Sequence, residues 1–199
     1  MQYLLTNSMK NPLQYVDDAI MYSVNKGVHA WNWTTGRTKA DLANEMLTVA
    51  SVSESLGAIF MGRIAPIAFI MVAPSMLFFS HFAQKINTKQ EKLEEEALEN
   101  EALSLDAKLN NNSHKANAYL WLSGSTFQYA PKETDYNANL GLGTGHALRS
   151  LSHFVTRADY LPPRKSCVRR GLESLAKMYK ESKLKPAIEP IPISYYQSE

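Results

Sequence analysis

Apolar residues recur at helical spacing along most of the chain, and they predict helices rather than strands. The first such stretch follows Pro12 and predicts an amphipathic helix over 13–26. Its apolar positions are Leu13, Val16, Ile20 and Val24. Acidic residues open this helix, where the positive end of the helix dipole favours them.

A second helix is predicted over 38–62, and its start is marked by a capping pattern. Thr38 and Asp41 have the spacing in which a hydroxyl and a carboxylate cap each other's backbone N–H groups. The apolar stripe on this helix consists of Leu42, Met46, Val49, Leu56 and Phe60. Residues 1–63 are therefore interpreted as an N-terminal amphipathic helical region.

The longest apolar run follows at 64–84, where 21 consecutive residues carry no formal charge. A helix of this length spans about 31 Å, which matches the hydrocarbon core of a bilayer. Arg63 and Lys85 bound the run as interfacial cations would. The run is interpreted as a transmembrane helix. Because Pro66 and Pro74 interrupt it, a helix buried in protein and a re-entrant segment stay open as alternatives.

Small residues in and before this run predict close packing against another helix. Such residues let two helix backbones approach each other. The helix-packing candidates are Ala58, Gly62, Ala65, Ala68 and Ala73.

Beyond the run, composition divides the chain into three further segments. Residues 85–110 read as an acidic charged helix that ends at the polar stretch Asn110–Ser113. Residues 111–185 read as a basic soluble region, in which 118–122 and 125–129 form either short strands or irregular apolar loops and helices follow at 147–156 and 166–183. Residues 186–199 read as a proline-rich extended tail.

No motif for catalysis, cofactor binding or metal binding is found. The glycines at positions 141, 143 and 145 lack the third glycine of a dinucleotide fingerprint, because His146 stands in its place. They are interpreted as a flexible turn. The five histidines do not pair at ligand spacing, and the single Cys167 excludes both an intramolecular disulfide and a cysteine-based zinc site. We therefore expect a non-enzymatic protein without a cofactor.

Charge is nearly balanced overall at +2, but its two signs are segregated along the chain. Residues 149–185 carry +7, whereas residues 91–106 carry −6. The candidate contacts to an anionic lipid or a nucleic acid are Arg164, Lys165, Arg169, Arg170, Lys177 and Lys180. Pairing between the basic region and the acidic helix is the simpler alternative.

Together these patterns predict a mainly α fold: amphipathic helices flank one membrane-spanning helix, and a small irregular α(+β) region follows. The predicted function is a membrane-anchored structural or assembly subunit of a complex of the respiratory, secretion or membrane-containing virion type. Its predicted partners are the other subunits and the lipid bilayer. A nucleic-acid-binding component of a particle is the alternative. Lys85, Lys89 and Lys92 outnumber Arg63 beside the run, which predicts a single-pass protein with its C-terminal region on the cytoplasmic or interior side.

Overall fold

The fold is helical throughout the residues that the computed structural model describes, which are 12–62, 66–100, 103–128 and 136–184. Six helices occupy these ranges: α1 (Pro12–Thr35), α2 (Lys39–Met61), α3 (Pro66–Asn100), α4 (Leu103–Gln128), α5 (Tyr136–Thr156) and α6 (Cys167–Leu184). The prediction of a mainly α protein is confirmed. The prediction of a β contribution is wrong, since 118–122 and 125–128 are helical within α4.

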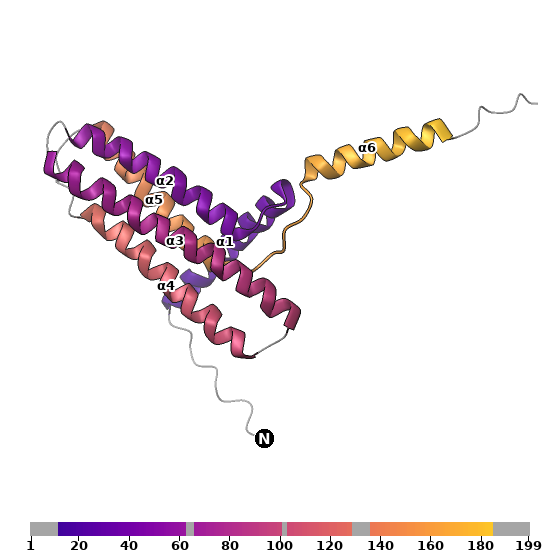
Figure 1. Cartoon of the computed structure of the whole chain (residues 1–199), viewed down its shortest axis with the longest axis horizontal. Helices are drawn as coiled ribbons and strands as arrows, with labels where there is room; N and C mark the ends of the chain where they lie inside the picture. The colour runs from indigo at the N-terminus through magenta and orange to yellow at the C-terminus, as the bar shows by residue number, and fades with distance from the viewer. Residues whose placement is uncertain (1–11, 63–65, 101–102, 129–135, 185–199) are drawn as a thin grey trace, which may run out of the picture.

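Helices α2 to α5 form an up-and-down bundle in which successive helices run in opposite directions (Figure 1). α2 packs against both α3 and α5, and α4 completes the square between those two helices. α1 covers the end of the bundle at which α2 begins and α5 ends. There Val28 joins Ala43, Val155 and Ala158 in one buried cluster.

Local signals place the junction between α1 and α2. Gly36 ends α1 with a positive φ of 78°, a conformation that glycine adopts without steric cost. Thr38 then caps α2, because its hydroxyl accepts from the Asp41 N–H at 3.3 Å while the Asp41 carboxylate accepts from the Thr38 N–H at 3.1 Å. The capping box predicted from the sequence is confirmed.

The uncharged run at 64–84 is not a separate membrane span, and the single-pass prediction is wrong. Among the described residues, every helix is either too short or too polar to traverse a bilayer. The part of the run from Pro66 onward is the first half of α3, which continues without a break into the charged segment and ends at Asn100. One side of it, including Val72, Met76 and Ala83, is buried against this chain's own helices.

The apolar stripe predicted on 38–62 is only partly buried, since Leu42, Met46 and Phe60 pack against the buried clusters while the other two residues face outward. Val49 and Leu56 are more than half exposed. The residues that α2 buries are mostly small or polar: Lys39, Ala40, Ala43, Leu47, Ala50, Ser51, Glu54, Gly57, Ala58 and Met61. Because large apolar side chains lie on both faces of α2, hydrophobic periodicity combined positions that pack against the core with positions that face outward.

Helix boundaries in the second half of the chain also differ from the prediction. The polar stretch 110–113 lies inside α4 rather than ending a helix, and α5 begins at Tyr136 rather than at 147. α6 agrees closely with the helix predicted over 166–183. The tail at 186–199 lies outside the described residues.

Candidate functional site

The closest helix contact in the bundle joins α2 and α5 through glycines. A Cβ atom on Gly57 would lie 2.8 Å from the Leu142 nitrogen, and one on Gly141 would lie 2.7 Å from the Gly57 Cα. Both distances are too short for a real side chain, so these positions admit only hydrogen. Gly141, Gly143 and Gly145 therefore belong to a packed helix, and their interpretation as a flexible turn is wrong.

This close approach encloses an ion pair between Glu54 of α2 and Arg149 of α5. Their side chains are only 1% and 2% exposed. Arg149 Nε donates to Glu54 Oε1 at 2.6 Å, and Nη2 donates to Glu54 Oε2, which makes the pair bidentate. The guanidinium also donates to the Ser80 hydroxyl and, at 3.4 Å, to the Met76 carbonyl, both on α3. One buried cation thus connects three helices.

Gly145 makes the space that Glu54 occupies. A Cβ atom there would overlap the Glu54 side chain and would lie 2.9 Å from the Ala50 carbonyl oxygen. Burial raises the pKa of Glu54 above its ordinary value, and the hydrogen bonds from Arg149 act in the opposite direction. Neither charged group reaches solvent, and the hydrogen bonds of the pair link α2, α3 and α5.

The five helix-packing residues proposed from the sequence do not lie together at one helix contact. Ala58 and Ala73 are buried on the neighbouring helices α2 and α3. Gly62 is the C-cap of α2. Ala68 lies in α3, and Ala65 lies outside the described residues. The small residues that bring two backbones together are instead Gly57 and the α5 glycines.

One half of the bundle presents a surface without charge. This uncharged half comprises 46–61 of α2, 66–84 of α3, 116–128 of α4 and 136–148 of α5, and its only Asp, Glu, Lys or Arg is the buried Glu54. The connections at 63–65 and 129–135, with Arg63, Lys132, Glu133 and Asp135, lie outside the described residues. The four helix stretches of the uncharged half are 13–19 residues long, which corresponds to a rise of about 20–28 Å along the helix axis.

Large apolar side chains cover the outside of the uncharged half. Those exposed are Val49, Val52, Leu56, Ile59, Ile67, Ile70, Met71, Leu77, Phe78, Trp121, Tyr136 and Leu140. On α2 they recur every three or four residues, and on α3 they lie at spacings that return to one face of the helix, so each of these adjacent helices carries an outward apolar stripe. The candidate functional site is this surface.

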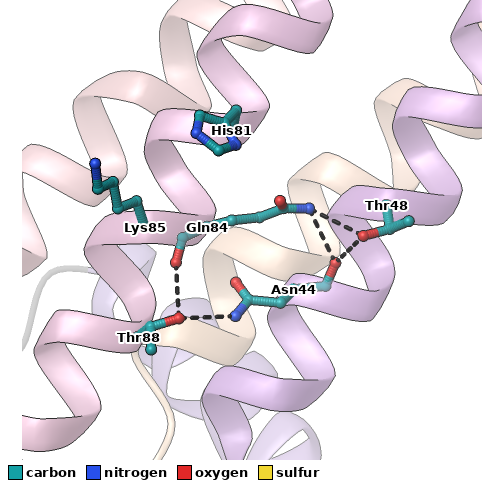
Figure 2. A pocket seen from close by; sticks show the side chains of 6 residues that line it. All are labelled: Asn44, Thr48, His81, Gln84, Lys85 and Thr88. Atoms are coloured by element: carbon teal, nitrogen blue, oxygen red, sulfur yellow. Dashed lines mark hydrogen bonds between the residues drawn. The ribbon is translucent and has the colours of Figure 1, made fainter.

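A shallow depression of about 390 Å³ lies between α2 and α3 at the edge of the uncharged half, as Figure 2 shows. Its lining is polar: Asn44, Thr48, His81, Gln84, Lys85 and Thr88. Gln84 Nε2 donates to the Thr48 hydroxyl at 3.0 Å, and Asn44 Nδ2 donates to the Thr88 hydroxyl at 3.2 Å. These hydrogen bonds between the lining side chains join α2 to α3.

The six basic candidates lie on α6 and on the segment that precedes it. Arg170 donates to the Trp33 carbonyl at 2.8 Å, and its guanidinium lies 5.1 Å from the centre of the Trp33 ring. The Glu173 carboxylate forms ion pairs with Lys165 at 2.7 Å and with Arg169 at 3.2 Å. The Lys177 ammonium lies 3.9 Å from the Glu181 carboxylate. The Arg164 N–H donates a hydrogen bond to the α1–α2 junction, and the Lys180 side chain is exposed. Among the described helices α6 packs against α1, and it points away from the bundle that contains the acidic end of α3 (Figure 1).

Comparison with protein families, with curated proteins and with solved structures finds no match to this chain. The described residues also contain no group of three or more His, Cys, Asp or Glu side chains that could hold a metal ion. Function is therefore inferred from the geometry alone.

Sequence reasoning missed the buried ion pair. A signal was present, since Glu54 is the lone charge in 46–61 and Arg149 is the first charge on α5. A single charge within an uncharged helix stretch is costly to bury without a partner. The two residues are 95 positions apart, however, and the sequence around each one does not indicate which residue it pairs with.

Proposed function

We propose that the protein is a non-enzymatic structural or assembly subunit that binds other protein subunits through the uncharged half of its bundle. The observation that carries this proposal is the continuous absence of exposed charge, combined with outward apolar stripes on α2 and α3. Protein interfaces are depleted of charge at their centres and enriched in large apolar residues. Large exposed apolar patches of this kind mark interaction sites.

The interior of the uncharged half is filled by other side chains, so the apolar side chains on its outside are not part of the buried core. Met61, Val72, Met76, Ala138 and Leu142 form a buried cluster there, and the Glu54–Arg149 pair lies among the helices below it. Side chains such as Ile70 and Leu56 are therefore left exposed by the described residues, and contact with another molecule would bury them.

Binding of nucleic acid by the basic region is the less favoured function. The basic residues surround a helix whose other face is apolar, including the exposed Leu172 and Leu175. Phosphate contacts use the cations of such a helix and leave its apolar face exposed to water.

The proposal is tested by placing a photo-crosslinking residue on the full-length chain in the cells that naturally make it. Position 70 reports on the uncharged half, and position 98 is the matched control, because Ile70 and Leu98 are 67% and 65% exposed on the same helix. We expect a discrete adduct with protein at position 70 and none at position 98. An adduct with lipid alone, or equal adducts at both positions, would contradict the proposal.

A charge substitution then shows whether the apolar surface itself makes the contact. Leu56→Arg, on the stripe of α2, is expected to abolish the adduct formed at position 70, since it places a charge at the interface centre. Leu98→Arg is expected to leave the adduct intact. Both sites are exposed, so each substitution is expected to change the free energy of unfolding by less than about 0.5 kcal/mol.

A further inference from the structure

Helix α6 extends from the bundle as an arm whose base is fixed (Figure 1). The Arg164 N–H donates to the Gly36 carbonyl at 2.9 Å, and Asn32 Nδ2 donates to the Pro162 carbonyl at 3.0 Å. A Cβ atom on Gly36 would overlap the Arg164 carbonyl. Together with the bond from Arg170 to Trp33, these contacts attach the start of the arm to the α1–α2 junction.

One face of the arm is apolar, and no other described helix of the chain covers it. Val168, Leu172, Leu175 and Tyr179 recur at intervals of four, three and four residues, which places them on one stripe. Met178 lies beside them, and all five side chains are 62–67% exposed. The stripe from Val168 to Tyr179 is about 17 Å long at the rise of a helix.

The arm and its base are also strongly basic. Residues 164–184 contain seven Lys or Arg residues and two glutamates, for a net charge of +5. Both glutamates are engaged within the arm, Glu173 by Lys165 and Arg169, and Glu181 by Lys177. What α6 offers to a partner is an apolar stripe bordered by positive charge.

On a second copy of this chain, the largest apolar surface lies apart from the largest cluster of exposed acids. On α1, where Leu13 and Val16 are exposed, the neighbouring Asp17 is already paired with Arg157. The apolar surface of the uncharged half lies around Ile70, whereas the acid cluster lies around Glu95 at the other end of α3. These positions are 25 residues apart, which is about 38 Å along the helix and more than twice the length of the stripe. A nucleic acid presents anions without an apolar layer. The surface of an anionic bilayer presents both at once, with acyl chains directly below charged headgroups.

We propose that α6 is a membrane-surface helix that binds anionic lipid, lying in the plane of the headgroups without crossing the bilayer. Its stripe enters the boundary between headgroups and acyl chains, where a tyrosine such as Tyr179 has both an apolar ring and a polar hydroxyl to place. Lys177 and Lys180 on the remaining face contact the headgroups, as does Lys183, whose ammonium lies 4.9 Å from the centre of the Tyr179 ring. This contact is separate from the protein-binding surface on the bundle.

The experiment measures binding of the full-length protein to two kinds of vesicle, one of phosphatidylcholine alone and one that also contains phosphatidylglycerol. We expect co-flotation with the anionic vesicles, weakened by added salt, and little with the neutral ones. Each lysine of the arm changed to glutamine, as in Lys180→Gln, is expected to weaken binding about fivefold. Equal binding to both vesicles would overturn the proposal.

A matched pair of apolar substitutions separates the arm from the rest of the surface. Leu175→Asp is expected to abolish flotation, whereas Leu98→Asp, at a site of similar exposure on α3, is expected to leave it unchanged. Ile70→Arg is also expected to leave it unchanged, and a loss there would assign lipid binding to the bundle instead. If Leu175→Asp floats normally while the lysine variants still bind a DNA duplex more weakly, the arm is a nucleic-acid contact and the proposal fails.

Discussion

The two tightest helix pairs of the bundle are held together by opposite means. α2 and α5 meet through glycines, with backbone against backbone, and the Ser53 hydroxyl donates to the Gly141 carbonyl at 2.9 Å. α3 and α4 meet through rings: Phe82 stacks on Tyr119 with centroids 5.4 Å apart, and Phe79 lies 6.4 Å from the same ring. The first contact has no room for a methyl group, whereas the second consists of side chains that can rearrange.

This difference explains where the chain buries its central charges. A narrow α2–α5 seam excludes water, and Gly145 leaves only the space that Glu54 fills. Ionised groups in such a place are stable only when their hydrogen bonds are satisfied, which the bidentate bonds from Arg149 achieve.

Removing one member of the ion pair is expected to have the largest effect on stability. Arg149→Met leaves the Glu54 carboxyl buried without a partner, and we expect it to lower the free energy of unfolding by about 3–5 kcal/mol. The double variant Glu54→Leu with Arg149→Met removes both charges and is expected to recover most of that loss. Urea unfolding followed by circular dichroism measures both. A single variant as stable as the native chain would show that the seam admits water.

Adding one methyl group to the seam is expected to have the next largest effect. Gly145→Ala forces the new Cβ against Glu54, and overpacking of this kind costs about 1–3 kcal/mol. Gly143→Ala is the matched control on the same helix, because nothing lies within 4 Å of its Cβ position. Since alanine favours helix over glycine, the control is expected to stabilise by about 0.5–1 kcal/mol. Thermal unfolding in which both variants shift in the same direction would contradict the close contact.

The aromatic pair is expected to tolerate a larger change at a smaller cost. Phe82→Leu removes the ring that stacks on Tyr119 but keeps an apolar side chain of similar bulk. We expect a loss of about 1 kcal/mol, as aromatic pairs contribute about 0.5–1.5 kcal/mol beyond their burial. The same unfolding measurements place this value beside that of Gly145→Ala. A loss greater than that of Gly145→Ala would reverse the comparison between the two seams.

The smallest effect is expected at the other end of α5, where His153 lies near Arg157 and Asp17. Burial and the nearby Arg157 lower the pKa of His153 below its usual 6.5, so the folded chain holds this imidazole neutral more readily than the unfolded chain does. Its contribution is therefore complete above pH 6.5 and is lost as the pH falls through that value toward the folded pKa. Unfolding free energies across this window should decline less in His153→Gln than in the native chain. Identical slopes would exclude His153 as the titrating group.

Local signals in the sequence determined where several helices lie. The capping residues Thr38 and Asp41 fixed the start of α2, and the apolar repeat after Pro163 predicted α6 almost to its ends. These features act within one turn or along one helix face, so the sequence itself contains everything that they require. The break expected at 110–113 failed because tertiary packing overrides the weak helix propensity of asparagine within α4.

Only the tertiary structure decided which face of each helix is buried and which residues meet. Outward and inward faces of α2 both carry apolar residues, so periodicity could not distinguish Val49 outside from Ala50 inside. The run at 64–84 was interpreted as a membrane span because an uncharged sequence does not show that one side of the helix, including Val72, Met76 and Ala83, packs against other helices of the chain. Glu54 and Arg149, and Gly57 and Gly141, are each more than 80 positions apart. Such pairs exist only after the chain has folded, because the geometry that joins them belongs to the bundle and not to any segment of it.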